Sequence, residues 1–181
     1  MSGKQAGETA AGWRATSWWV GVVAIVAGLF VWALTYDVGG NDFESAKTAV
    51  CISNVKELGT ALSLYAENSD GRLPDSSTWM NELQPYMKNE RILHCPALLA
   101  NGPGAYGYAM NFEISGKEVA RIANPDGVPA LFESVLMVRN ATSGFYGLPD
   151  PRRHRNWRGN CTVVGFLDGH VEQVRRGGVR P

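Results

Sequence analysis

The chain has 181 residues and carries 17 basic and 17 acidic side chains, so its formal net charge is zero. Without a net charge no long-range field draws the protein toward nucleic acid or acidic polymers, and we expect no nucleic-acid partner. About 145 residues follow an apolar N-terminal segment, which suits one compact domain. The 21 glycines and 9 prolines indicate many turns and favour a mixed α+β domain over a helical bundle.

Residues 17–36 form an apolar segment without a charged side chain. A helix of this length rises about 30 Å, the thickness of the hydrocarbon core of a bilayer. Trp18 and Trp19 lie at one end, and Trp32 and Tyr36 lie near the other, as in the aromatic belts of membrane helices. The segment therefore predicts a transmembrane helix. A buried core helix is the alternative, but such helices rarely run this far without a charge.

A cleaved signal peptide is a second alternative for the same segment. Its apolar region is usually about 7–15 residues long and precedes a cleavage site made of small residues. Here the apolar run is longer and is followed by Tyr36, Asp37 and Val38. The sequence therefore favours a retained anchor.

The charges on either side of the segment predict its orientation. Lys4 and Arg14 precede it, whereas Asp37, Asp42 and Glu44 follow it. The positive-inside rule then places a tail (1–16) in the cytoplasm and the domain outside. We expect a single-pass protein of a bacterial inner membrane with a periplasmic, or otherwise extracytoplasmic, C-terminal domain.

Two glycines in the apolar segment indicate a partner within the membrane. Gly21 and Gly28 lie seven residues apart on nearly one helical face, with Ala24 between them. Such a small-residue stripe lets another transmembrane helix approach closely. Small residues are also common in membrane helices that have no partner.

A long amphipathic helix is expected after a linker (37–42), over residues 43–68. Asn41 or Asp42 can cap its start. Apolar residues recur at spacings of three and four, which predicts one face packed on the rest of the domain. The residues of this face are Cys51, Val55, Leu58, Leu62 and Tyr65. Ser69, Asp70 and Gly71 are expected to end the helix.

The remaining chain is expected to form a short helix followed by an antiparallel sheet. Ser76 or Ser77 can cap the short helix, over residues 78–83. Short β-type runs then occupy residues 106–110, 130–132 and 162–167. Asp168 and Gly169 separate the last run from residues 170–174, and such a pair is a strong hairpin signal.

An ordered set of motifs in residues 43–176 resembles the type II pseudopilin-like proteins, also described as prepilin-type proteins with a C-terminal H-x9-DG domain. The resemblance implies a pilin-like fold, with an N-terminal helix laid across an antiparallel sheet and the domain at 43–181. The matching stretches are CISNVKELG (51–59), LYAEN (64–68), DGRLP (70–74), Trp79, LQPY (83–86), HCP (94–96), YGY (106–108), NP (124–125), Arg153-His154 and FLDGHV (166–171).

The chain departs from this family in two places. Thirteen residues, rather than nine, separate His154 from Asp168. The apolar segment opens with Ala15-Thr16-Ser17-Trp18 and lacks both the family's processing motif and the glutamate near the start of its membrane helix. In the family that glutamate is thought to pair with a neighbour's N-terminus during filament growth. These departures argue against processing and against filament assembly.

The three cysteines allow one disulfide, since an extracytoplasmic domain permits oxidation. Cys51 and Cys95 both fall in the family-like motifs, and we expect them to pair. The pair would close a loop of about 45 residues, worth about 4 kcal/mol in the chain-entropy model. The alternative is three buried free thiols. Cys161 suits an inward strand position, and the absence of Cys-x-x-Cys spacing argues against zinc.

His154, Asp168 and His170 invite a metal or catalytic interpretation. Asp168 is better explained as a turn former and His170 as a strand residue, so we expect no catalytic set, metal or cofactor. A nearby basic run offers an interface instead, because Trp and Arg are frequent hot-spot types. The interface candidates are Arg153, Arg155, Trp157 and Arg158, with a solvated loop as the alternative.

These observations predict a non-catalytic, membrane-anchored accessory or scaffolding subunit of a larger membrane complex, such as an energy-transducing assembly. It would dock through its transmembrane helix and its pilin-like domain on other membrane-protein subunits, with no small-molecule substrate. The alternative is a minor pseudopilin of a type II secretion or pilus-like system. A third class is an envelope enzyme or binding protein that uses the region of His154, Asp168 and His170.

Overall fold

The structure is a computed structural model that describes residues 12–35, 39–102, 105–144, 148, 153–156 and 159–175. The chain divides into two compact units, residues Met1–Gly40 and Asn41–Pro181. Each unit is described by itself.

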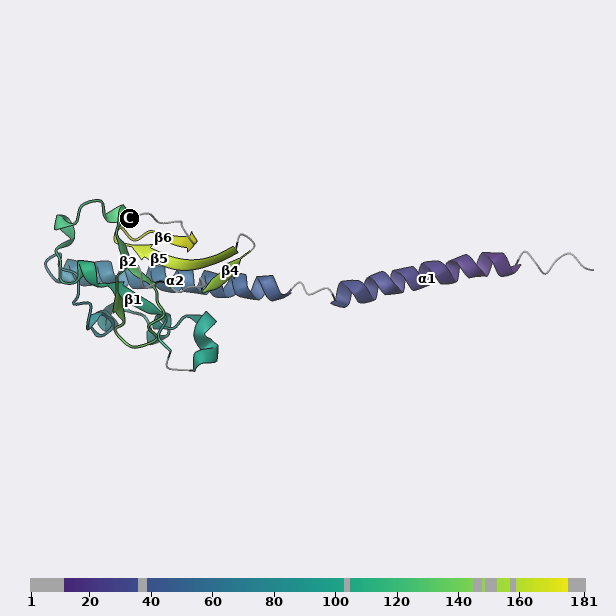
Figure 1. Ribbon diagram of the computed structural model, residues 1–181, viewed down its shortest axis with the longest axis horizontal. Coiled ribbons are helices and arrows are strands. Elements are labelled where there is room, and N and C mark those ends of the chain that lie inside the picture. Colours follow the sequence, from purple (N-terminus) through teal and green to yellow (C-terminus); the bar gives the residue numbers. More distant parts are fainter. Residues whose placement is uncertain are drawn as a thin grey trace, which may run out of the picture. The chain divides into compact units, whose positions relative to one another are not determined.

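The first unit contains helix α1 (Gly12–Thr35; Figure 1). Residues Trp18–Thr35 are long and apolar enough to cross a membrane, and none of them is buried. Burial would mark the core helix of a soluble protein, so its absence here fits the expected span. The helix starts five residues before the predicted residue 17. Trp18, Trp19 and Trp32 are exposed on it, whereas Tyr36 lies outside the described residues.

Helix α2 (Gly39–Asn68) begins inside the predicted linker. The expected capping role of Asn41 and Asp42 is therefore wrong, because both residues lie within the helix. The predicted apolar face is confirmed: Val55, Leu58 and Leu62 are buried in the core, along with Cys51. Tyr65 is only partly buried.

The end of α2 follows the prediction. Asp70 and Gly71 have positive φ angles of 52° and 76°, a conformation that glycine adopts without steric cost. The amide of Gly71 donates to the carbonyl of Ala66 at 2.8 Å, which satisfies one of the last carbonyls of the helix.

Within the residues that the structure describes, a six-stranded sheet forms the other layer of the second unit. Its strands follow the order β3-β1-β2-β5-β4, and β6 also pairs with β5. The strand bounds are β1 (Tyr108–Asn111), β2 (Pro129–Glu133), β3 (Thr142–Ser143), β4 (His154–Asn156), β5 (Gly159–Phe166) and β6 (Val171–Arg175).

The sequence predicts an antiparallel sheet, but the sheet is mixed. Strand β3 runs parallel to β1, with Met110 paired to Thr142. The reason is the connection after β2, which carries the chain to the far side of β1, where β3 forms and pairs with β1. The other pairings are antiparallel, and the β5–β6 hairpin at Asp168-Gly169 is confirmed. Gly169 takes the positive φ of 92° that this turn requires.

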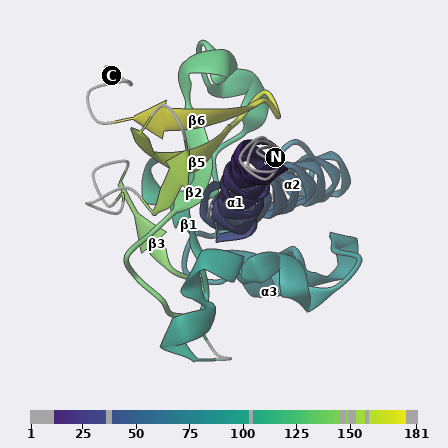
Figure 2. The same cartoon turned by 90° about the vertical axis from the view of Figure 1, so that its right-hand side faces the viewer.

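Helix α2 lies beside the sheet (Figure 2). Its close approach to β5 is at Gly165. A Cβ on this residue would lie 2.6 Å from Cγ1 of Val55. Only glycine therefore lets the helix come this near to β5.

Short helices cover the rest of the core. In α3 (Trp79–Glu82) the predicted caps are wrong: Thr78 precedes the helix without a capping side-chain bond, and Ser77 instead donates to Asp75. The indole of Trp79 is buried and donates to the carbonyl of Ala141 at 2.9 Å. The 3-10 helices are η1 (Gln84–Tyr86), η2 (Glu90–Leu93), η3 (Pro96–Asn101), η4 (Phe112–Ile114), η5 (Val119–Arg121) and η6 (Pro125–Gly127).

Candidate functional site: a buried cluster of two cysteines, a glutamate and a histidine

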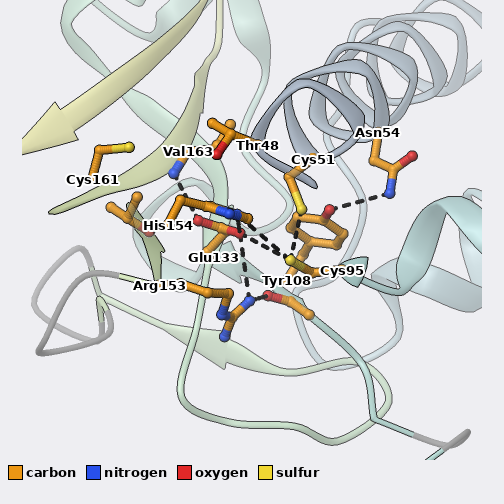
Figure 3. Close-up of polar contacts among 12 residues, drawn as sticks. Thr48, Cys51, Asn54, Cys95, Tyr108, Glu133, Arg153, His154, Cys161 and Val163 are labelled. Carbon is orange, nitrogen blue, oxygen red and sulfur yellow. Dashed lines mark hydrogen bonds and ion pairs between the residues drawn. The ribbon is translucent and has the colours of Figure 1, made fainter. Parts of the chain in front are cut away.

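Four side chains from distant parts of the sequence meet in the core beside α2. Cys51 comes from α2, Cys95 precedes η3, Glu133 ends β2 and His154 begins β4 (Figure 3). All four are buried, and one donor atom of each lies within 4.8 Å of the others. We call these four residues the Cys–Glu–His cluster.

Gly107 lets the segment that carries Cys95 lie against the start of β1. A Cβ at Gly107 would be 2.7 Å from the Cβ of Cys95, so a larger residue would push this segment outward. The amide of Gly107 also donates to the carbonyl of Leu93 at 3.0 Å. The backbone just before β1 thus holds Cys95 facing Cys51.

Glu133 has a hydrogen-bond partner on each carboxylate oxygen. Its Oε2 accepts from the hydroxyl of Thr162 at 2.9 Å and from the amide of Val163 at 2.8 Å. Its Oε1 lies 2.7 Å from Nε2 of His154 and 3.7 Å from Nη1 of Arg153. A buried charge is tolerated when it is paired and hydrogen-bonded, and Glu133 meets both conditions.

Arg153 is a structural residue rather than the exposed interface anchor that the sequence suggested. Only 6% of its side chain is exposed. Its guanidinium donates to the carbonyl of Gly107 at 2.7 Å and to the carbonyl of Ser134. It therefore links the start of β4 to the residue before β1 and the residue after β2, and it supplies a positive charge next to Glu133.

The structure brings Cys51 and Cys95 together, as their predicted pairing requires. Their Sγ atoms lie 2.6 Å apart, and the structure records both residues, as well as Cys161, as thiols. Cys95 Sγ also lies 3.3 Å from Oε1 of Glu133 and 3.6 Å from Nε2 of His154. Oxidation of the pair stays a prediction. Cys161 takes the buried strand position expected for it, and its Sγ contacts Gln173 at 3.5 Å.

Proximity shifts the pKa of every member of the cluster. Burial alone raises the pKa of Glu133, but the hydrogen bond and charge of His154, with the charge of Arg153, hold it below its usual value. Burial alone lowers the pKa of His154, but the sulfur of Cys95 and the carboxylate of Glu133 raise it to about 9.

The two thiols shift in opposite directions. The hydrogen bond from Cys51 lowers the pKa of Cys95 to about 6 against the effect of burial, and the hydrogen bond of His154 adds to this lowering. The hydrogen bond to Cys95, together with burial, raises the pKa of the Cys51 thiol far above its ordinary value. Cys95 is thus the sulfur that carries negative charge when one of the two thiols ionises.

The cluster lacks the arrangement of a catalytic triad. In a triad the histidine uses one ring nitrogen toward the nucleophile and the other toward the carboxylate. Here Nε2 of His154 faces both Cys95 and Glu133, and Nδ1 is buried without a hydrogen-bond partner among the described residues. Cys95 is also only 1% exposed, so no substrate can reach its sulfur in this conformation.

The cluster matches a zinc site in donor types but less well in spacing. Thiolate, imidazole and carboxylate are all zinc ligands. Two thiolates bound tetrahedrally at about 2.3 Å from one ion are about 3.8 Å apart. The two sulfurs, at 2.6 Å, would have to separate by more than 1 Å.

The sequence grouped His154 with Asp168 and His170, and the structure separates them. His154 lies in the core, whereas Asp168 and His170 form an exposed pair in the β5–β6 turn. Oδ1 of Asp168 accepts from the amide of His170 at 3.0 Å and lies 2.6 Å from its Nδ1. This is the turn-forming role expected of Asp168.

The remaining interface candidates lie at the edge of the described structure. The backbone of Arg155 belongs to β4, and Trp157 and Arg158 lie outside the described residues.

Sequence reasoning missed Glu133, although one signal marks it: a carboxylate directly follows the apolar run Ala130-Leu131-Phe132. A charge at the end of a buried strand requires a partner, and His154 and Arg153 supply it.

No protein-family model, no curated protein and no solved structure matches this chain.

Proposed function

We propose that the protein is a non-catalytic accessory or scaffolding subunit, anchored in a membrane by α1 and docked on other membrane-protein subunits. The observation that carries this proposal is α1 itself, whose 18-residue apolar stretch, Trp18–Thr35, has no buried residue. A helix of this kind is stable when lipid or another apolar helix covers it. Gly21 and Gly28, which have open space around their Cα atoms, offer the face for such a helix.

A second exposed apolar surface lies on the folded unit. Four consecutive side chains after β2 are between 38% and 59% exposed, and they form what we call the 135–138 loop: Val135, Leu136, Met137 and Val138. Contiguous exposed apolar side chains are typical of protein–protein contacts. The loop follows directly on Glu133 and Ser134, whose burial holds its first residue in place.

The buried polar cluster supports the non-catalytic part of the proposal. Its charged groups are paired with one another, and all four members are enclosed by the core. Such a cluster specifies a unique packing rather than receives a substrate.

The charges that flank the apolar segment in the sequence favour an extracytoplasmic position for the folded unit, with the bacterial inner membrane as its location.

The resemblance to pseudopilin-like proteins belongs to the same proposal. The resemblance implies a long helix laid across a sheet, and the packing of α2 on β5 at Gly165 supports it. The rival role is a minor pseudopilin. It requires cleavage before the membrane helix, which distinguishes it experimentally from a retained anchor.

Affinity purification of the full-length tagged protein in a mild detergent tests the accessory role. We expect a native-gel species larger than the monomer that contains other membrane proteins. Replacing Gly21 and Gly28 by leucine should reduce the recovery of these partner proteins. Replacing Leu136 and Val138 by serine should do the same. Phe112→Ser is the matched control, because Phe112 is a similarly exposed apolar residue, 54% exposed on η4.

A monomer with no stoichiometric partner in several mild detergents would refute the accessory role. Mass spectrometry of the N-terminus separates the rival. An intact terminus at Met1 or Ser2 argues for a retained anchor, whereas a new terminus just before the apolar segment would establish the pseudopilin role.

A further inference from the structure

We propose that Cys51 and Cys95 form a redox couple in which Cys95 is the reactive sulfur and His154 and Glu133 position its thiolate. Oxidation of the couple cross-links α2 to the segment before η3. The inference rests on the geometry of the Cys–Glu–His cluster and does not depend on the accessory role.

The choice of partners follows from the contacts of each sulfur. Cys51 and Cys95 are 44 residues apart in sequence, yet their Sγ atoms are in direct contact (Figure 3). Cys161 lies on β5, and its Sγ instead contacts the side-chain oxygen of Gln173. The couple is therefore Cys51 with Cys95, and Cys161 serves as an internal reference thiol.

The surroundings of the two sulfurs are unequal. Cys95 Sγ faces Oε1 of Glu133 at 3.3 Å and Nε2 of His154 at 3.6 Å. A protonated Cys95 donates to the carboxylate, whereas a deprotonated Cys95 accepts from the imidazolium and from the Cys51 thiol. Both states of Cys95 thus find a partner without movement of the cluster, and the proton released by the thiol has His154 as its acceptor.

The oxidation is an ordinary thiol–disulfide exchange with a low-molecular-weight or protein disulfide as the oxidant. The Cys95 thiolate attacks one sulfur of that disulfide and expels the other as a thiolate, which forms a mixed disulfide. Cys51 then loses its proton and attacks Sγ of Cys95, expelling the second sulfur of the oxidant. Two protein thiols become one disulfide, and the oxidant leaves as two thiols that carry the two electrons and two protons.

Access to the couple requires local opening, because Cys51 and Cys95 are 0% and 1% exposed. The segment that opens carries Cys95 and is held to the rest of the core by the bond from the side-chain amide of Asn54 to the carbonyl of His94, at 3.2 Å, and by the bond between Gly107 and Leu93. Opening detaches this segment from α2, and oxidation locks the two together. The redox state of the couple therefore controls how firmly α2 is held in the core.

Redox titration of the full-length protein in detergent tests the inference. The protein is equilibrated in buffers of reduced and oxidised glutathione, quenched in acid, and alkylated after denaturation, and the bound labels are counted by intact mass. We expect wild type and Cys161→Ser to lose two labels together in one transition. Cys51→Ser and Cys95→Ser should show no such intramolecular transition.

The positioning roles have their own readout. Loss of a charge-assisted hydrogen bond to the thiolate in His154→Gln should shift the glutathione equilibrium about tenfold toward the disulfide. In the Cys51→Ser background, where Cys95 is the reacting thiol, His154→Gln should raise the pH at which the rate of exchange with a disulfide reagent levels off. Thr162→Val is the matched control, since Thr162 bonds Oε2 of Glu133 at 2.9 Å and its removal leaves the Oε1 contact with Cys95 in place.

Three labels on wild type at every glutathione ratio would overturn the inference. So would one tightly held equivalent of zinc that protects both thiols from alkylation, since the cluster would then be a metal site. A His154→Gln protein that fails to fold, as judged by circular dichroism, leaves the comparison of wild type, Cys161→Ser and Cys51→Ser to decide the result.

Discussion

Oε1 of Glu133 lies 2.7 Å from Nε2 of His154, and both side chains are completely buried. The contact joins the last residue of β2 to the first residue of β4. Arg153 adds a positive charge 3.7 Å from the same oxygen. Taking charges out of water is costly, so the core tolerates this carboxylate only while its partners are in place.

Removing that carboxylate should therefore destabilise the protein strongly. Glu133→Gln leaves Arg153 without its buried counter-charge and removes from His154 the carboxylate that it contacts, and breaking a buried pair in this way costs about 3–5 kcal/mol. Urea unfolding followed by tryptophan fluorescence measures the loss. Glu172→Gln is the control, because the Glu172 side chain is 57% exposed and its replacement should change stability by less than about 0.5 kcal/mol. Equal stability of the two variants would show that Glu133 is not held as a paired charge.

The pH dependence of stability should differ between the two redox states of the couple. With the thiols reduced, the folded protein at pH 7.5 holds His154 protonated, with a pKa of about 9, and Cys95 deprotonated, with a pKa of about 6. The unfolded chain has a neutral imidazole and a neutral thiol there. The folded and the unfolded protein therefore bind the same number of protons on His154 and Cys95 together. These two residues should not change the free energy of unfolding between about pH 6.5 and 8.

Oxidation removes the Cys95 thiolate, so the pH dependence of the free energy of unfolding then reports on His154. We expect the hydrogen bond and the charge of Glu133 to keep the pKa of His154 raised against the effect of burial after oxidation. The stabilisation is therefore fully present below the unfolded pKa and is lost as pH rises through the folded pKa, by up to about 1.4 kcal/mol per pH unit. Urea unfolding at pH 6, 7 and 8 with and without reductant measures both slopes. In oxidised His154→Gln the free energy of unfolding should no longer fall as the pH rises. If it still falls, a group other than His154 causes the pH dependence.

Gly165 should be intolerant of even one methyl group. In Gly165→Ala the new Cβ meets Cγ1 of Val55 at 2.6 Å, and valine is too stiff to move aside. Overpacking of this kind costs about 1–3 kcal/mol. Gly59→Ala is the control: Gly59 lies inside α2 with nothing near its Cα, so alanine there should stabilise the protein by about 0.5–1 kcal/mol.

A double-mutant cycle checks the cause. Val55→Ala makes room for the new methyl group, so Gly165→Ala should cost less in that background than in wild type. Additive costs would mean that the strain arises from the backbone of β5 and not from its contact with α2.

The elements that sequence reasoning recovered depend on local signals. The spacing of Cys51, Val55 and Leu58 identifies the buried face of α2, because a helix repeats every 3.6 residues whatever it packs on. The Asp168-Gly169 turn fixes the β5–β6 hairpin for the same reason, since the turn residues decide the geometry.

The Cys–Glu–His cluster could not be read from the sequence in this way. Glu133 reaches it because it pairs with Tyr108 across β1 and β2, and His154 reaches it because it pairs with Cys161 across β4 and β5. These registers depend on long-range strand pairing. Arg153 shows the same limit: an arginine in a basic run suggests a surface, and only its contacts with Gly107 and Ser134 reveal that it is buried.

The membrane role of α1 can be tested by placing two charges in its middle. Nine Val, Ile, Leu and Phe side chains between Trp18 and Thr35 favour insertion by about 3–5 kcal/mol in total. Replacing Val23 and Val26 by lysine opposes insertion by about 5–7 kcal/mol, which exceeds this gain. We expect wild type, and the double leucine variant as control, to resist alkaline carbonate extraction, and the double lysine variant to be released. If the lysine variant stays in the membrane pellet, contacts other than insertion of α1 hold the protein there.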